Sequence, residues 1–395
     1  MKYITRTVWI LSLVSLFTDT ASEMLYPVMP VYLKSIGFSV VLIGILEGVA
    51  EATAGLSKGY FGKRSDLSGK RVPYVQAGYA LSAISKPMLA FFVYPVWIFF
   101  SRTLDRLGKG LRTGARDAIL SDEATWQTKG KVFGFHRSMD TVGAVLGPLF
   151  ALVYLYYHPV NYQPLFLIAF IPGLIAVSAS FFLKGKKRIA GKTNVRVPFF
   201  SFLSYWKVSP PEYRKLVTGL LIFAVFNSSD VFLLLKVKQS GLGDTMVIGV
   251  YIFYNLVYAM FAFPVGIIAD NIGLKKIFII GLALFAAVYF GMSVNTNLYL
   301  FFGLFFLYGV YASATEGISK AWISNISNKT DTATAIGTYS GLQSICALLA
   351  SSLTGVLWYN FGASIAFRIT AIVTSLVIVY FLFMFRLHEK TDTVK

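Results

Sequence analysis

The chain has 395 residues, of which 56% are hydrophobic and 14% are charged, and its mean hydropathy is +0.65. This balance excludes a soluble globular protein and indicates that lipid is the main solvent. In a soluble protein, the formal net charge of +18 would suggest a nucleic-acid partner. Here the basic residues lie in loops between apolar stretches, so we expect no nucleic-acid partner.

Twelve apolar stretches of membrane-spanning length follow one another along the chain, and a bilayer core takes about 20 apolar residues per helix. The first stretch is preceded by Lys2 and Arg6, as in a signal peptide. No small-residue cleavage site follows it, so we interpret it as the first span. The expected spans are residues 8–33, 40–62, 73–92, 94–113, 132–155, 163–184, 214–236, 245–268, 275–293, 298–319, 334–358 and 363–386.

Lysine and arginine residues gather in every second loop between the expected spans. The loops of the opposite kind hold almost none, with Lys34, Lys236 and Lys238 as the exceptions. Positive charge marks the cytoplasmic side of a membrane protein. We therefore expect both termini to lie in the cytoplasm.

The first two expected spans each carry two acidic residues four positions apart, a spacing that places each pair on one helix face. Asp19 and Glu23 form the first pair, and Glu47 and Glu51 form the second. Charged groups inside a membrane are costly and persist where they pair or face an aqueous cavity. Because neighbouring carboxylates repel, one of them favours its protonated form. Both pairs are candidates for proton coupling, and the alternative is a structural partner for a base elsewhere.

The loop after the second span has a counterpart after the eighth span. Gly62-KRS-Asp66-LS-Gly69-Lys70-Arg71 ends the second span, and Gly266-IIA-Asp270-NI-Gly273-L-Lys275-Lys276 ends the eighth, about 204 positions later. A repeat at a fixed offset indicates two related halves. Related halves of this kind place a substrate site at their interface, near the middle of the membrane.

The fourth expected span carries a stripe of basic residues at spacings of three and four, which share one helix face. The stripe consists of Arg102, Arg106, Lys109 and Arg112. Arg106 and Lys109 are our candidates for binding an anionic substrate group or for holding the carboxylates of the first span. The alternative is a purely structural network of ion pairs. At the cytoplasmic mouth of the stripe, Arg116 and Asp117 are interpreted as gate residues.

The fifth expected span begins with His136, Arg137 and Asp140. His136 has a side chain that titrates near neutrality when unperturbed, so it is either a proton carrier or a structural residue. We expect Asp140 to pair with Arg137 or with a base of the fourth span. All three residues are candidates for the substrate or charge network.

The longest polar stretch, residues 184–214, divides the chain into two groups of six spans and opens with four basic residues. We therefore expect an all-α membrane protein with an N-terminal six-helix bundle (1–184), a cytoplasmic basic linker (185–213) and a C-terminal six-helix bundle (214–395). The segment from Gly185 to Thr193 looks like a phosphate-binding loop, but five residues separate its glycines where four are needed. We expect no cofactor.

The second half carries fewer charges at the positions that echo the first. Tyr339 corresponds to His136 and Gln343 corresponds to Asp140, so we expect the coupling machinery in the N-terminal half. Glu316 is a candidate to complete the site from the other side, whereas Asp230 is expected at the outer rim. The sequence contains no His or Cys cluster with metal-ligand spacing and no nucleophile motif, so we expect neither a metal site nor an enzyme.

With its twelve spans and two matching loops, the whole chain resembles the major facilitator superfamily. The resemblance implies two pseudo-symmetric six-helix bundles and a cytoplasmic latch that holds them in the outward-facing state. Leu67 stands where the family usually has Arg or Lys, so we expect a weaker first latch. The gate residues implied by the resemblance are Asp66, Gly69, Lys70, Arg71, Asp270, Lys275 and Lys276.

Two narrower likenesses add to this resemblance. In the fifth span, Gly143, Gly147 and Pro148 are similar to the antiporter motif of the family. The alternative is ordinary close packing of small residues against a bent helix. The first, second and fourth spans resemble those of a mostly uncharacterised prokaryotic branch of the family. This likeness implies a prokaryotic cytoplasmic (inner) membrane.

These observations predict a secondary transporter of a small solute that is coupled to protons and works by alternating access as a monomer in the lipid bilayer. The antiporter-like motif favours export. The basic stripe leaves import of an anionic metabolite or a metal chelate as an alternative. A membrane-embedded enzyme built on His136 and Asp140, or a channel, are the alternatives from other classes.

Overall fold

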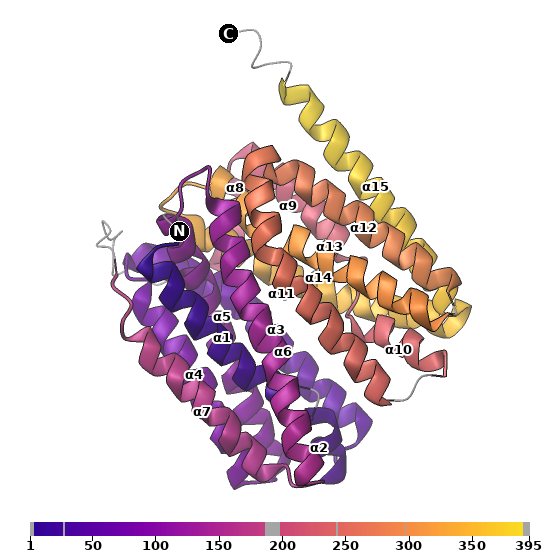
Figure 1. The fold of residues 1–395 in the computed structure, drawn as a ribbon. Coiled ribbons are helices and arrows are strands. Elements are labelled where there is room, and N and C mark those ends of the chain that lie inside the picture. Colours follow the sequence, from indigo (N-terminus) through magenta and orange to yellow (C-terminus); the bar gives the residue numbers. More distant parts are fainter. Residues whose placement is uncertain (1–3, 27, 186–197, 242–243, 296, 390–395) are drawn as a thin grey trace.

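The computed structural model describes residues 4–26, 28–185, 198–241, 244–295 and 297–389, and within them the chain is all-helical (Figure 1). The helices are α1 (Arg6–Leu25), α2 (Met29–Ser35), α3 (Val40–Ser68), α4 (Val72–Phe91), α5 (Pro95–Glu123), α6 (Lys129–Tyr157), α7 (Gln163–Ser180), the 3-10 helix η1 (Phe199–Ser204), α8 (Tyr205–Val208), α9 (Pro211–Ala224), α10 (Val231–Gln239), α11 (Asp244–Ile272), α12 (Leu274–Val294), α13 (Leu298–Ile326), α14 (Thr332–Phe361) and α15 (Ala363–Glu389). The expected all-α class is confirmed.

Two of the expected spans are interrupted, one at the start of each half. The span expected at 8–33 divides into α1 and α2, and the sequence places Pro27, which lies outside the described residues, in the gap. Proline lacks a backbone donor and disfavours helix in the residue before it. The span expected at 214–236 divides into α9 and α10 around Asn227–Asp230, where short polar side chains compete with the helix for backbone groups.

Eight described helices are long and apolar enough to cross a membrane. They are α1, α6, α7, α11, α12, α13, α14 and α15. The other four expected spans correspond to α3, α4, α5 and the pair α9 and α10. The last two helices are short because of the break. The segment of α5 from Arg102 to Asp117 has seven charged residues, so its low hydropathy does not identify it as a span.

The charges of α5 are placed against neighbouring helices and not against lipid. Asp105 is the clearest case, because its carboxylate accepts hydrogen bonds from Lys86 Nζ at 2.6 Å and from Ser82 Oγ at 2.5 Å, both on α4. All three residues are buried. An ion pair satisfied in this way lowers the cost of keeping charged groups at membrane depth.

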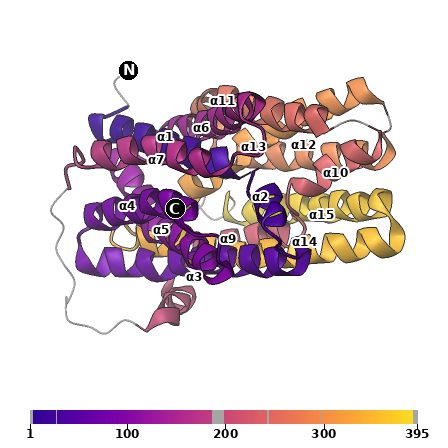
Figure 2. The same ribbon diagram turned by 90° about the horizontal axis from the view of Figure 1, so that it is seen from below.

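The helices pack mainly within their own half, and two pairs make most of the contact between the halves. In the first half, α1 packs on α6 and α7, and α4 packs on α5 and α7. In the second half, α13 packs on α11 and α12, and α12 packs on α15. Across the halves α6 lies along α11 and α3 lies along α14 (Figure 2). These two pairs form the seam at which one half can move against the other.

Part of the expected linker is helical. The helices η1 and α8 lie against α3 and α14, so they contact both halves. Phe202 is 1% exposed, and the Nζ of Lys63 on α3 donates to the carbonyl of Ser201 at 2.7 Å. Residues 186–197, which carry much of the basic charge expected for the linker, lie outside the described residues. The bundle boundaries at 184 and 214 stay a prediction.

Candidate functional site

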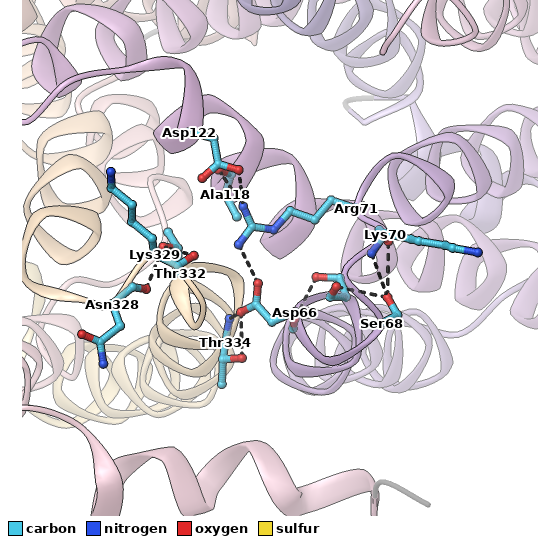
Figure 3. Close-up of polar contacts among 12 residues, drawn as sticks. Asp66, Ser68, Lys70, Arg71, Ala118, Asp122, Asn328, Lys329, Thr332 and Thr334 are labelled. Atoms are coloured by element: carbon cyan, nitrogen blue, oxygen red, sulfur yellow. Dashed lines mark hydrogen bonds and ion pairs between the residues drawn. The ribbon is translucent and has the colours of Figure 1, made fainter. Parts of the chain in front are cut away.

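The loop residues predicted as a latch meet the opposite half at the end of the molecule where α3 and α11 end, which we call the latch end. Asp66, near the end of α3, accepts a hydrogen bond at 2.7 Å from the backbone N–H of Thr334 and another at 2.9 Å from its hydroxyl. Thr334 lies in the first turn of α14, whose N–H groups lack helical partners and attract negative charge (Figure 3). Asp66 therefore caps a helix of the other half.

Arg71 holds Asp66 in this position. Its guanidinium donates at 2.6 Å to Asp66, at 2.6 Å to Asp122 and at 3.1 Å to the carbonyl of Ala118 (Figure 3). The last two residues belong to α5, so the arginine ties the end of α3 to a neighbouring helix of the same half. Gly69 ends α3 in the left-handed conformation, with φ of 64°, and Lys70 is exposed.

The second loop makes the reciprocal contact. Asp270, near the end of α11, accepts hydrogen bonds from the backbone N–H groups of Gly130 at 2.7 Å and Lys131 at 2.8 Å, which lie in the first turn of α6. Each half thus presents one aspartate to a helix N-terminus of the other. Gly273 follows α11 with φ of 105°, and the first turn of α12 holds Lys275 and Lys276.

Further polar contacts join the halves near the latch end. Asp117 on α5 is paired with Lys320 on α13 at 2.8 Å and with its neighbour Arg116 at 2.9 Å. Lys129, at the start of α6, donates to the carbonyl of Ser324 at 2.6 Å. Arg116 and Asp117 therefore belong to the contacts that close this end. This position agrees with their interpretation as gate residues, and the role of a gate stays a prediction.

A cavity of about 260 Å³ lies between the halves. Its walls are formed by α1, α5 and α6 on one side, and by the break between α9 and α10, α11 and α13 on the other. Five tyrosines line it, together with five acids and two bases. The charged lining residues are Asp19, Glu23, Lys109, Arg137, Asp140, Asp230 and Glu316.

The N-terminal wall contains two neighbouring carboxyl groups. Asp19 of α1 and Asp140 of α6 both line the cavity, and Ser15 donates a hydrogen bond to Asp140. Because neighbouring carboxylates repel, one of the two favours its protonated form. Arg137 binds the other oxygen of Asp140 at 2.6 Å, which confirms the expected pairing. The wall thus holds an acid pair that is tied to a guanidinium.

Arg137 also reaches the opposite wall. Its Nε donates to the hydroxyl of Tyr258 on α11 at 2.5 Å, and its guanidinium lies 3.6 Å from the carboxylate of Glu316 on α13. The same guanidinium stands over the Tyr258 ring, 5.2 Å from its centroid. One arginine therefore connects an acid of the first half, Asp140, with an acid and an aromatic ring of the second.

The antiporter-like motif sets how closely α1 approaches α6. A Cβ atom added at Gly147 would come within 2.6 Å of the Met24 backbone nitrogen and 2.7 Å of the Thr20 carbonyl. Gly143 faces α1 in the same way beside Asp19. The glycines therefore bring the acids of α1 against α6. Glu23 also lies on α1, and its carboxylate accepts a hydrogen bond at 3.4 Å from the hydroxyl of Tyr251 on α11.

The C-terminal wall holds an acid that was expected elsewhere. We expected Asp230 at the outer rim, but it lines the cavity. Its two carboxylate oxygens accept hydrogen bonds from the hydroxyls of Tyr254 and Tyr308, each at 2.5 Å. The expectation was wrong because the helix break just before α10 sets this residue at the depth of the cavity.

The tyrosines of this wall were also missed, because aromatic residues are abundant throughout the chain. A signal was present in their spacing. Residues 251, 254 and 258 of α11, and residues 308 and 311 of α13, are all tyrosines separated by three or four positions. This spacing places each set on one helix face, and all five tyrosines line the cavity.

Several predicted residues lie away from the described cavity lining. Arg106 is paired with Glu51 of α3 at 3.2 Å. Arg112 stands over the ring of Tyr79, 4.6 Å from its centroid. His136 is 4% exposed, and its Nδ1 lies 3.5 Å from Ser12 Oγ. Of the basic stripe, only Lys109 reaches the cavity. The side chain of Glu47 lies outside the described residues.

Comparisons with known proteins agree on one family. The model of the Major Facilitator Superfamily matches residues 11–254 and 245–395. An uncharacterized MFS-type transporter of Methanocaldococcus jannaschii is 30% identical over 363 residues, which cover 90% of this chain and 89% of the relative. An uncharacterized protein of Mycobacterium bovis is 28% identical over 180 residues, which cover 45% of this chain and 44% of that protein.

A solved structure shows the same fold. The human organic anion transporter MFSD10 superimposes with a TM-score of 0.78, covering 95% of this chain and 99% of the other at 16% sequence identity. The expected fold of two six-helix bundles is therefore confirmed. Together with the family match along the chain, this shows that the protein is a membrane-embedded secondary transporter of the Major Facilitator Superfamily.

Proposed function

We propose that the protein is a proton-coupled antiporter that alternates access to the cavity between its halves. The observation that supports this most strongly is that Asp19 and Asp140 line the same cavity as neighbours, since two adjacent carboxylates favour one exchangeable proton between them. The pair is also connected, through Arg137, to the second half. A proton at this place can therefore bias how the halves sit against each other.

The coupling follows from which acids hold Arg137. With a proton on the pair, Asp140 binds the guanidinium more weakly, and Glu316 and Tyr258 of the second half hold it. When the proton leaves, the extra negative charge draws Arg137 back to Asp140. Two bases of α5 lie close by, since Lys109 lines the same cavity and Arg116 donates to Ser15, which itself donates to Asp140. Each proton transfer then changes the contacts between the halves, which is what alternating access requires.

The proposed orientation places the latch end in the cytoplasm, because basic residues gather beside both latch loops. The described contacts at that end close it, which supports an outward-facing state for this structure. In export, the latch opens, solute enters from the cytoplasm, and protons entering from outside drive its release. The close α1 and α6 crossing at Gly143 and Gly147 supports this direction, because it is the feature that resembles the antiporter motif.

A test that needs no known substrate is the pH dependence of the conformation. The only cysteine, Cys346, is replaced by alanine, and spin labels are attached at exposed Trp126 and Thr330, which lie in latch-end loops of opposite halves. In proteoliposomes, the label distance distribution should shift between acidic and alkaline buffer. Asp19→Asn should remove most of this shift, because it leaves the pair without an ionisable partner for Asp140.

The matched control is Glu212→Gln, which neutralises an acid at the start of α9, away from the cavity lining. It should leave the pH dependence intact. A distribution that responds to pH equally in the wild type and in Asp19→Asn would contradict the proposed coupling site, and the other acids of the cavity would then carry the proton.

A further inference from the structure

The cavity between the halves carries a strong excess of negative charge. Its lining includes five carboxyl groups and two basic groups, so the formal charge is −3, or −2 with one proton shared by the Asp19 and Asp140 pair. Of the two bases, Arg137 is already paired with Asp140 and Glu316. Charges in a cavity with low-dielectric walls act on a ligand more strongly than charges in water. A cationic ligand would neutralise part of this excess.

The end of α9 adds partial negative charge to the same wall, whereas the start of α10, directly after Asp230, carries partial positive charge. The last carbonyls of a helix carry partial negative charge, and within the described chain those of Phe223 and Ala224 accept only turn hydrogen bonds, from Phe226 and Asn227. Helix α9 ends at Ala224, and the residues that follow it, Asn227 and Ser228, line the cavity. Helix ends and unwound backbone at such breaks are where transporters of this architecture bind ions and charged groups. The end of α9 therefore favours a positive group.

An aromatic wall surrounds the acid at this break. The hydroxyls of Tyr254 and Tyr308 fix both oxygens of Asp230, and their ring centroids lie 5.5 Å apart. A carboxylate accepts about four hydrogen bonds, so the two tyrosines leave part of its capacity for a ligand. Tyrosine rings attract cations at their faces, most strongly where water is excluded. An acid that is held by tyrosine hydroxyls and lies beside aromatic rings is well suited to an ammonium group.

We propose that the substrate is a monovalent organic cation, either a protonated amine or a quaternary ammonium, whose charged nitrogen binds at Asp230 beside Tyr254 and Tyr308. This inference rests on the proposed function and names the substrate class of the same cavity. A volume of about 260 Å³ lies just below the range of common small-ligand pockets, which suits a ligand of one ring. The positive charge gives exchange with protons a simple basis, because both neutralise the same cavity.

The test uses two aromatic probes of similar size and opposite charge, benzyltrimethylammonium and benzenesulfonate, with the full chain purified in detergent. Binding to the folded state raises the temperature of unfolding. Benzyltrimethylammonium should raise it in a concentration-dependent way, and benzenesulfonate should not. Asp230→Asn keeps the shape of the side chain but removes its charge, and it should weaken binding of the cation about tenfold or more.

Two more variants separate binding from folding. Tyr308→Phe keeps the ring but removes one hydroxyl that positions Asp230, and it should weaken binding about threefold. Glu212→Gln, an acid of the same broken span but at its far end, should bind the cation as the wild type does. If Asp230→Asn fails to fold, the graded loss in Tyr308→Phe still tests the site.

The outcomes also distinguish this inference from the proposed coupling. Stabilisation by benzenesulfonate and not by the cation would overturn the substrate class and favour an anionic solute at Lys109. Equal cation binding by the wild type and Asp230→Asn would overturn the site. Cation binding that depends on Asp230, together with spin-label distances that do not respond to pH, would support this inference and contradict only the coupling.

Discussion

The two walls of the cavity come from related halves, but their chemistry differs. The N-terminal wall is ionic, with Asp140 bound to Arg137 and Asp19 in the same lining. The C-terminal wall is aromatic, and its acid Asp230 is held by tyrosine hydroxyls alone among the described contacts. An acid beside other acids and bases responds strongly to a proton, whereas an acid among aromatic rings provides a stable place for a cation. This difference is the basis of our proposal that the N-terminal wall carries the proton and the C-terminal wall binds the solute.

The two halves share an interrupted first span and a latch aspartate. Each half begins with an interrupted span, and each presents one aspartate to a helix N-terminus of the other at the latch end. The common features therefore serve movement, because breaks and latches are where the halves separate and meet. The features that differ line the cavity. We expect variants of the shared features to change the conformation, and variants of the walls to change coupling or binding.

The largest effect is expected for the residue that connects the walls. Arg137→Gln leaves the buried Asp140 without its guanidinium, and breaking a fully buried ion pair costs about 3–5 kcal/mol, which is an upper bound here because the Arg137 side chain is 32% exposed. The variant should unfold at a clearly lower temperature and lose transport. Arg64→Gln, which removes a guanidinium bound to Tyr60 on exposed surface, is the control. Wild-type stability of Arg137→Gln would show that the two walls are not joined through this residue.

A smaller effect is expected at the latch, and it compares the two halves directly. Replacing an acid at a helix N-terminus costs about 1 kcal/mol, or roughly a fivefold change in the ratio of closed to open latch. Asp66→Asn should open the latch more than Asp270→Asn, because Asp66 also binds Arg71. Distances between spin labels at the latch end measure both. The reverse order would support the weaker first latch expected from Leu67.

The sequence predicted the N-terminal wall better than the C-terminal wall, for a physical reason. Charges inside apolar spans are costly, so Asp19, Glu23, Arg137 and Asp140 stand out by residue type alone. The position of Asp230 depends on where a helix breaks. The polar run Asn227–Asp230 is a sign of this break, but it lies inside a stretch of membrane-spanning length, so the helices on either side of it were interpreted as one span.

The sequence also did not show which residues the basic side chains of the fourth span contact. The spacing of Arg106, Lys109 and Arg112 correctly places them on one helix, but neighbouring helices decide what each one contacts. Arg106 meets Glu51 of α3 and Arg112 meets Tyr79 of α4, and only Lys109 reaches the cavity. The anionic substrate that the whole stripe suggested stays an alternative. The five acids of the lining against two bases support the cation that we propose.

The most direct test of the proposed roles of the two walls compares two kinds of exchange in proteoliposomes. One assay follows labelled benzyltrimethylammonium driven by a proton gradient, and the other follows its exchange against unlabelled benzyltrimethylammonium without a gradient. Asp19→Asn should abolish the first and retain the second, because the solute site remains intact. Asp230→Asn should lose both. Full gradient-driven accumulation by Asp19→Asn, or undiminished exchange by Asp230→Asn, would contradict the assignment of proton and solute to different halves.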